Sequence, residues 1–296
     1  MKSSRLSLLI VMIIAAGFLT GCASTIAKMS VDGMKPIMVE MRNATNKNQD
    51  PVMVGEAMPM ILVQMDGFIM VSPENRYMLT SAAEVNMGYA FLFVEDVDKK
   101  RAGLLYLKAR DYALRALSLN NTFKQALMQD DLDVFTSALK TIHKRDVAPL
   151  FLATNSWLSW INAVHGERSE VLNDLPRIEA MMDRIMLLDD THYYGGIHAL
   201  TGVYAIQRPE MFGGRPDEAE AEFKEAFEIS ESKFLLWKYL YARYYAVQKK
   251  DRELFVSTLK EIIESPDDLL PNEAFVNNAV RKKAATLLLK VDEYFQ

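Results

Sequence analysis

The feature that most constrains the fold is a helical periodicity that continues from Val52 almost to the end of the chain. Apolar residues recur at intervals of three and four, and short turn signals such as Asn120-Asn121 and Ser265-Pro266 separate the periodic segments. No run combines sustained apolar–polar alternation with β-branched enrichment, so strands are not expected. The pattern predicts an all-α fold in which short connections make neighbouring helices antiparallel.

The turn signals divide this region into a series of helices of ordinary length. We expect Asn75 to cap a helix that runs to about Phe93, and Pro176 to kink or split the helix expected over residues 169–188. The other helices are expected at about residues 52–71, 99–119, 122–129, 131–144, 146–165, 197–207, 216–229, 233–247, 251–264 and 272–294.

The segment 52–71 is apolar enough to suggest a membrane span. However, Glu56, Pro59, Gln64 and Asp66 interrupt it. Charges are costly at the centre of a bilayer, so the sequence favours an unusually apolar helix buried in the protein.

Internal repeats distinguish a stacked solenoid from a simple bundle. In the tetratricopeptide pattern, small residues let two helices approach closely and aromatic residues fill the groove between them. The first expected hairpin has suitable residues at all six positions, namely Tyr89-Ala90, Phe93, Ala102, Tyr106 and Ala109. Partial matches follow at Leu200, Gly202, Tyr204, Ala219, Phe223 and Ala226, and at Tyr241-Ala242, Tyr245, Leu254 and Thr258. We therefore predict stacked antiparallel helical hairpins, a tetratricopeptide-like solenoid, as a single domain over residues 52–296.

The N-terminus has the order of segments that an export signal needs. Lys2 and Arg5 precede an apolar run from Leu8 to Phe18, which ends in Leu19-Thr20-Gly21-Cys22. That last box resembles the lipobox of bacterial lipoproteins, and Cys22 is the single cysteine of the chain. It predicts a cleaved signal peptide over residues 1–21 and a lipid on Cys22; the alternative is an ordinary secreted protein with a chance cysteine.

Residues 22–51 are then expected to form a lipid anchor and spacer, with the polar stretch from Asn43 to Pro51 as a loop. The mature protein is expected in the periplasm, held by its lipid on a membrane of the bacterial envelope.

Composition excludes several classes of function. A net charge of −5 does not provide the basic surface that nucleic acid requires. With Cys22 lipidated, no cysteine remains for a disulfide or a metal. Of the 18 methionines, 11 lie between Met29 and Met87, a clustering that suits either an adaptable apolar surface or, the favoured interpretation, core.

The sequence contains no common phosphate-binding, serine-hydrolase or zinc-protease motif. Asp130-Asp131-Leu132-Asp133 begins like a calcium loop, but its glycine and closing glutamate are absent, so a helix cap is expected. His192 and His198 could form a metal site with Asp189 or Asp190, but residues six apart on one helix point to different faces. We expect no metal, no cofactor and no enzymatic activity.

A family resemblance rests on the glycine-rich region after residue 192. The matching stretches are Tyr193-Tyr194-Gly195-Gly196, Leu200-Thr201-Gly202-Val203-Tyr204-Ala205, Phe212-Gly213-Gly214-Arg215-Pro216-Asp217-Glu218-Ala219, Phe223-Lys224-Glu225-Ala226-Phe227, Tyr241-Ala242-Arg243-Tyr244-Tyr245-Ala246-Val247-Gln248 and Asp251-Arg252-Glu253-Leu254-Phe255. They resemble the TatT family, the lipoprotein T-components of tripartite ATP-independent periplasmic (TRAP) transporters. The resemblance is best over residues 193–264. Ser230-Glu231-Ser232-Lys233 lacks the proline that a standard repeat places there, which leaves the repeat count open.

The resemblance implies a periplasmic homotrimer with a channel through each protomer. It also implies binding to the solute-binding protein (P-component) and delivery of a hydrophobic ligand. Candidate channel residues are those around the shared glycines, namely Tyr193, Tyr194, His198, Tyr204, Met211 and Phe212. The alternative function is a scaffold lipoprotein for cell-envelope assembly, which would use the same fold with peptides or outer-membrane proteins as ligands.

Overall fold

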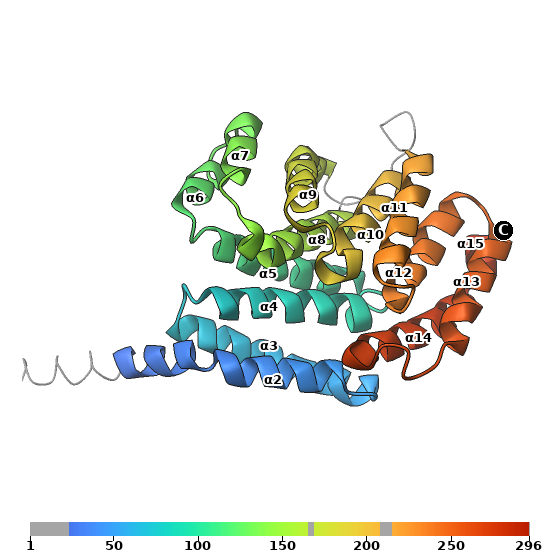
Figure 1. Ribbon diagram of the computed structural model, residues 1–296, viewed down its shortest axis with the longest axis horizontal. Helices are drawn as coiled ribbons and strands as arrows, with labels where there is room; N and C mark the ends of the chain where they lie inside the picture. Colours follow the sequence, from blue (N-terminus) through green and yellow to red (C-terminus); the bar gives the residue numbers. More distant parts are fainter. Residues whose placement is uncertain (1–23, 165–168, 208–214, 296) are drawn as a thin grey trace, which may run out of the picture.

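The computed structural model describes residues 24–164, 169–207 and 215–295, and every regular element within these ranges is a helix. Successive helices pack side by side in antiparallel pairs (Figure 1). The expected all-α fold of stacked helical hairpins is therefore confirmed. Residues 1–21 and Cys22 lie outside the described residues, so the signal peptide and the lipid anchor stay predictions.

The helical elements follow one another with short connections. In chain order they are α2 (Lys35–Asn46), α3 (Pro51–Val71), α4 (Arg76–Tyr89), η1 (Ala90–Val94), α5 (Lys99–Leu117), α6 (Asn121–Leu127), α7 (Leu132–Leu139), η2 (Lys144–Asp146), α8 (Val147–Val164), η3 (Ser169–Asp174), α9 (Leu175–Asp189), α10 (His192–Gln207), α11 (Pro216–Ile229), α12 (Leu235–Leu240), η5 (Tyr241–Ala246), α13 (Arg252–Glu264), η6 (Pro271–Glu273), α14 (Ala274–Leu288) and α15 (Val291–Tyr294). Of these, η1 and η5 are π-helical and η2, η3 and η6 are 3-10 turns. Residues 24–33 are also helical.

Local sequence determines several helix boundaries as expected. The Asn75 side chain accepts a hydrogen bond from the Met78 N–H (3.0 Å) and caps α4. The Asp131 side chain caps α7, so the acidic run there serves as a cap, as predicted. Pro176 lies in the first turn of α9, directly after η3, and the helix expected over residues 169–188 is split there.

Several tetratricopeptide positions are buried where helices pack together. On α5, Ala102 and Ala109 are fully buried and Tyr106 between them is almost completely so. Gly202 on α10 faces α11 so closely that a Cβ atom would lie 2.9 Å from the ring of Phe223. The small and aromatic residues thus pack as the repeat pattern predicts.

The segment before residue 52 differs from the expectation. Residues 43–46, predicted as part of a loop, form the last turn of α2, and Asp50 caps α3 after a short turn. Met34 and Met38 pack against the cluster around Met65 and Leu79. This apolar contact brings α2 into the folded body, although the segment was predicted to be a spacer.

The C-terminal helix α14 contacts the first helices of the chain. Helix α14 lies against α2 and α3, so the last hairpin returns to the first helices (Figure 1). The Asn278 amide donates a 2.9 Å hydrogen bond to the Gln49 carbonyl across this contact. The last hairpin therefore closes the stack of helices against the first ones.

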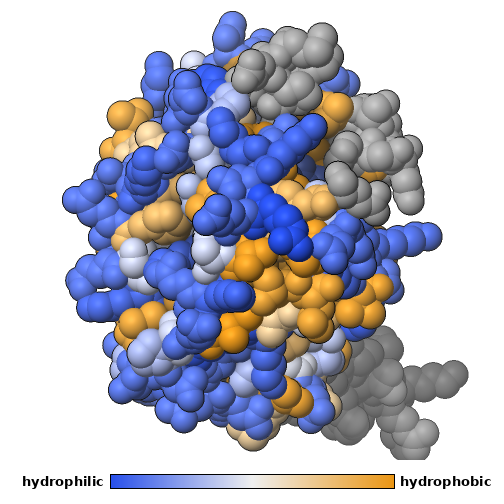
Figure 2. Space-filling view, turned by 90° about the vertical axis from the view of Figure 1, so that its right-hand side faces the viewer, coloured by the Kyte–Doolittle hydropathy of each residue, from blue (hydrophilic) through white to orange (hydrophobic). Residues whose placement is uncertain are grey.

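Helix α3 is long and apolar enough to cross a membrane, judged by length and composition alone. One face, which includes Met58, Leu62 and Met65, is buried in the protein, whereas Val63 and Met70 on the other face are exposed. The prediction of a buried helix holds for the first face only. At the C-terminal end of the molecule, an apolar patch lies among mostly hydrophilic residues (Figure 2).

Candidate functional site

The closed solenoid surrounds a cavity of about 660 Å³. Its wall comes from both ends of the chain and from the middle, including α2, α3, α4, α5, α8, α10, α12 and α14. Most of the wall is apolar, with Met58, Ile61, Met65, Met87, Phe91, Leu92, Phe151, Leu158, Leu200, Leu236, Trp237, Phe275 and Val276 among its members. A space of this size and character can hold a mid-sized apolar ligand.

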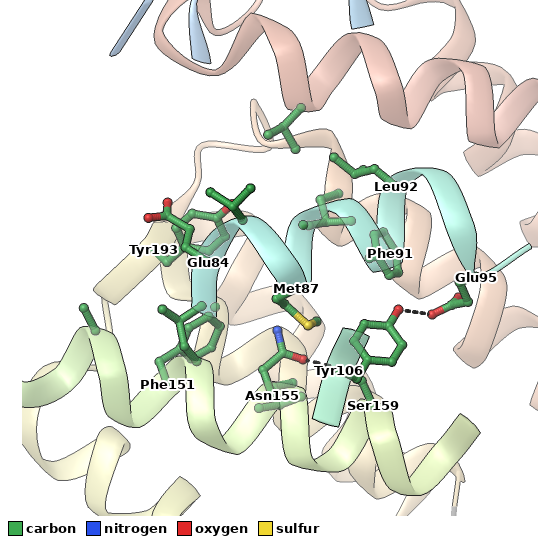
Figure 3. Close-up of a pocket in the computed structure, with 18 of the residues that line it drawn as sticks. Glu84, Met87, Phe91, Leu92, Glu95, Tyr106, Phe151, Asn155, Ser159 and Tyr193 are labelled. Carbon is green, nitrogen blue, oxygen red and sulfur yellow. Dashed lines mark hydrogen bonds between the residues drawn. The ribbon is translucent and has the colours of Figure 1, made fainter. Parts of the chain in front are cut away.

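One stripe of α4 and η1 shows how polar and apolar groups are distributed along the cavity. Glu84, Met87, Phe91 and Glu95 follow one another at spacings of three and four, and all four line the cavity. The two carboxyl groups are eleven residues apart, which corresponds to roughly 16 Å along the axis. Apolar side chains therefore lie between two acidic ends (Figure 3).

Two π-helical segments border the cavity. Segment η1 contributes Phe91 and η5 contributes Arg243. A π-turn changes the helical hydrogen-bond pattern and is frequent at functional sites. The Phe91 carbonyl accepts a 2.7 Å hydrogen bond from Lys283 Nζ of α14, which ties η1 to the last hairpin.

The charges at the Glu95 end of the cavity are paired. Arg243 Nη1 lies 2.8 Å from Glu95 Oε1 and 3.2 Å from Asp96 Oδ1, and Lys283 also pairs with Asp96. Burial alone would raise the pKa of Asp96, but Lys283 and Arg243 hold it below its usual value. The Tyr106 hydroxyl donates to Glu95. Two carboxylates and two cations thus form a balanced cluster.

The Glu84 end is different. Arg42 Nη1 lies 3.5 Å from Glu84 Oε2, while Asn46 and the Tyr194 hydroxyl each approach Glu273 Oε1 at 3.4 Å. Burial raises the pKa of Glu84. Burial and the neighbouring Glu84 raise the pKa of Glu273 to about 7, against the lowering effects of Tyr194, Arg42 and Asn46. This end contains two carboxyl groups and one guanidinium.

A strained turn places an aromatic side chain in the wall. Tyr193, Tyr194 and Gly195 have φ values of 51°, 59° and 74°, three left-handed residues in succession. This conformation costs about 1–3 kcal/mol for each residue other than glycine, so its surroundings must hold it. The Tyr193 ring packs against Phe151 and Trp237. Gly195 has the positive φ that a glycine pair permits, while a Cβ on Gly196 would lie 2.7 Å from the Phe151 ring.

The residues predicted from the sequence are only partly brought together. Tyr193 lines the cavity, and Tyr194 stacks on Phe234 behind it. His198 Nδ1 lies 2.7 Å from Glu222 Oε2, and the Tyr204 hydroxyl donates to Glu179 Oε1 (2.6 Å); neither His198 nor Tyr204 is part of the cavity wall. Met211 and Phe212 lie outside the described residues.

His192 and His198, the histidines of the candidate metal site, lie in different surroundings. His192 borders the cavity with its ring against Phe151, and burial lowers its pKa, opposed by Asp189. His198 pairs with Glu222. Within residues 24–164, 169–207 and 215–295, no group of three or more His, Cys, Asp and Glu side chains is placed to hold a metal.

Most of the cavity wall was not predicted from the sequence. Glu84, Glu273 and Arg243 come from separate hairpins, and only the closure of the solenoid brings them together. The sequence did contain one indication of the cavity wall, namely the methionine-rich stretch between Met29 and Met87. Its members Met38, Met41, Met58, Met65 and Met87 line the cavity, and the last three are also buried, so core and adaptable surface coincide there.

Two comparisons with known proteins bear on this site. A family model described as TRAP transporter T-component matches residues 47–295, which include nearly all of the cavity wall. A search of curated proteins finds no match.

Proposed function

The chain belongs to the TRAP transporter T-component family, and from this premise we propose that it binds a hydrophobic small molecule in its cavity and delivers it to the solute-binding protein of a TRAP system. Family membership supports an accessory role in TRAP transport. The observation that carries the ligand-binding part is the cavity of about 660 Å³ with its largely apolar wall.

We further propose that the protein is not an enzyme and works in the periplasm. The predicted lipid on Cys22 would hold it on an envelope membrane, and it would act as a homotrimer with the cavity as the channel of each protomer. The family's place in transport supports this role. The alternative, a scaffold lipoprotein for envelope assembly, would use the helical surface and leave the cavity without a function.

Filling the cavity tests the proposal. Gly88 lines the cavity, and a Cβ built there meets no atom within 4 Å. Gly88→Leu should therefore place a side chain in the cavity without disturbing its helix. Gly67 on the exposed side of α3 also has no atom within 4 Å, so Gly67→Leu is a matched control.

Small molecules that co-purify with each variant are extracted and identified by mass spectrometry. Loss of an apolar molecule from Gly88→Leu and its retention in Gly67→Leu would support the proposal. Equal amounts in all three proteins, or none in any of them, would contradict a ligand-binding cavity.

A pull-down from native membranes tests the partner, with the intact lipoprotein as bait. Recovery of a periplasmic solute-binding protein is expected. Recovery of envelope-assembly factors without one would favour the scaffold function.

A further inference from the structure

Two buried carboxylate oxygens of the cavity wall, Glu95 Oε1 and Glu273 Oε2, have no hydrogen-bond partner among the described residues, and the first of them lies 2.8 Å from Arg243 Nη1 in an ion pair. Glu273 is 8% exposed and lies where η6 leads into α14. Its Oε1 accepts hydrogen bonds from the Asn46 amide and the Tyr194 hydroxyl, whereas its Oε2 accepts none from the residues that the structure describes. An unsatisfied buried acceptor is costly, and a ligand that donates a hydrogen bond would remove this cost.

The charge balance of the cavity points to the same place. At the Glu95 end, the carboxylates of Glu95 and Asp96 are paired with the cations Arg243 and Lys283. At the Glu84 end, Glu84 and Glu273 face one cation among the residues that the structure describes, Arg42, which lies 3.5 Å from Glu84. The Glu84 end therefore has one more negative than positive charge when both carboxyl groups are ionised.

We propose that Glu273, together with Glu84, binds the ammonium head of an amphipathic amine whose hydrocarbon part occupies the apolar middle of the cavity. This inference rests on the proposed function and specifies its ligand. Met87 and Phe91 follow Glu84 along the cavity wall, so an alkyl chain anchored at the carboxyl groups extends along them (Figure 3). A carboxylate head at the same place would be repelled by two acidic groups.

The proton on Glu273 competes with such a ligand. The groups that face this carboxyl are Glu84 from α4, Arg42 and Asn46 from α2, and Tyr193 and Tyr194 from α10. Together they leave its pKa raised to about 7. An alkylammonium keeps its charge up to about pH 10. Its affinity should therefore rise as the pH rises through 7 and Glu273 loses its proton.

Three ligands with the same chain test this inference. Decylammonium, decanol and decanoate are titrated below their micelle concentrations into the purified protein, freed of bound small molecules, by isothermal titration calorimetry. We expect decylammonium to bind at least about tenfold more tightly than the other two, the gain typical of a charge-assisted hydrogen bond. Glu273→Gln should weaken decylammonium roughly ten- to hundredfold and leave decanol within about threefold.

The pH dependence gives a second readout. Decylammonium affinity should increase between pH 6 and 8 in the unaltered protein and increase less in Glu273→Gln, where Glu84 is the one carboxyl group of the proposed site that still titrates. Circular dichroism checks that the variant folds; if it does not, Glu84→Gln replaces it, with the same preference expected to fall. Equal affinities for the three ligands, or equal losses for all of them, would overturn the ammonium site and leave the apolar cavity standing. If none of the three binds and Gly88→Leu changes nothing, the proposed ligand-binding function itself fails.

Discussion

The indole Nε1 of Trp237 on α12 donates a 2.7 Å hydrogen bond to the backbone carbonyl of Tyr194, in the middle of the left-handed turn. Trp237 also packs against the ring of Tyr193 at a centroid distance of 6.1 Å. A single side chain thus holds both the backbone of the strained turn and the aromatic group that the turn presents to the cavity.

Trp237→Phe should destabilise the protein by about 1–2 kcal/mol, since it keeps an aromatic ring but leaves the Tyr194 carbonyl without the indole donor. The free energy of unfolding from urea denaturation measures this loss. Trp160→Phe is the control, because Trp160 contacts Arg110 through the face of its ring. An equal loss in both variants would assign the effect to ring size and contradict the role of the hydrogen bond.

Gly195→Ala should destabilise the protein by about 1–2 kcal/mol, because the position has a φ of 74° and a Cβ would lie 3.1 Å from Ile229. Gly103→Ala provides the contrast. Gly103 lies in α5, and its Cβ would meet the side chains of Ala163 and Val164 on α8 at an ordinary 3.4 Å. Helix propensity predicts that this second change is neutral or stabilising by up to about 1 kcal/mol. Thermal unfolding of the two variants should shift in opposite directions, and a parallel shift would contradict the assigned strain.

Asp96→Asn should lower the free energy of unfolding by about 2 kcal/mol, because it leaves Arg243 and the buried Lys283 with only Glu95 between them. Since the folded protein holds the pKa of Asp96 below its usual value, this stabilisation is present near neutral pH and is lost as the pH falls through the folded pKa. The difference between Asp96→Asn and the unaltered protein should therefore shrink in acid.

Lys283→Met is the companion to that variant. It removes one cation, keeps an apolar stem against Phe91, and leaves Asp96 paired with Arg243. A smaller loss than in Asp96→Asn is expected from urea denaturation. A larger one would mean that the bond from Lys283 to the Phe91 carbonyl, and not the charge balance, stabilises this end.

The parts of the fold that could be predicted from the sequence depend on neighbours along the chain. Asn75 and Asp131 cap helices because a short polar side chain can reach N–H groups two or three residues ahead. The burial of Ala102, Tyr106 and Ala109 follows from residue size and helical spacing. These features require no knowledge of the rest of the molecule.

The cavity could not be predicted in this way. The contact of Asn46 with Glu273 spans 227 positions and exists only because α14 returns to α2. Periodicity does not reveal the extra residue that makes η1 and η5 π-helical. A glycine such as Gly195 permits a positive φ, but nothing about a tyrosine predicts that positions 193 and 194 share it. Their conformation is imposed by packing around Phe151, Phe234 and Trp237.

Glu273 should make the stability of the protein fall as the pH rises from about 4.5 to 7. Its pKa is raised to about 7 in the folded protein from an ordinary value of 4.5. The folded state therefore binds this proton more tightly than the unfolded state, and the advantage is lost as the folded carboxyl ionises. The full effect is on the order of 3 kcal/mol.

Urea denaturation at pH 5 and pH 8 should show a loss of stability in the unaltered protein that is smaller in Glu273→Gln, because this variant keeps the shape of the side chain and carries no charge. Glu84 supplies the remaining slope, because burial raises its pKa as well. An identical pH dependence in the two proteins would show that Glu273 ionises as freely in the folded cavity as in water, and the unpaired carboxylate would then have no energetic consequence.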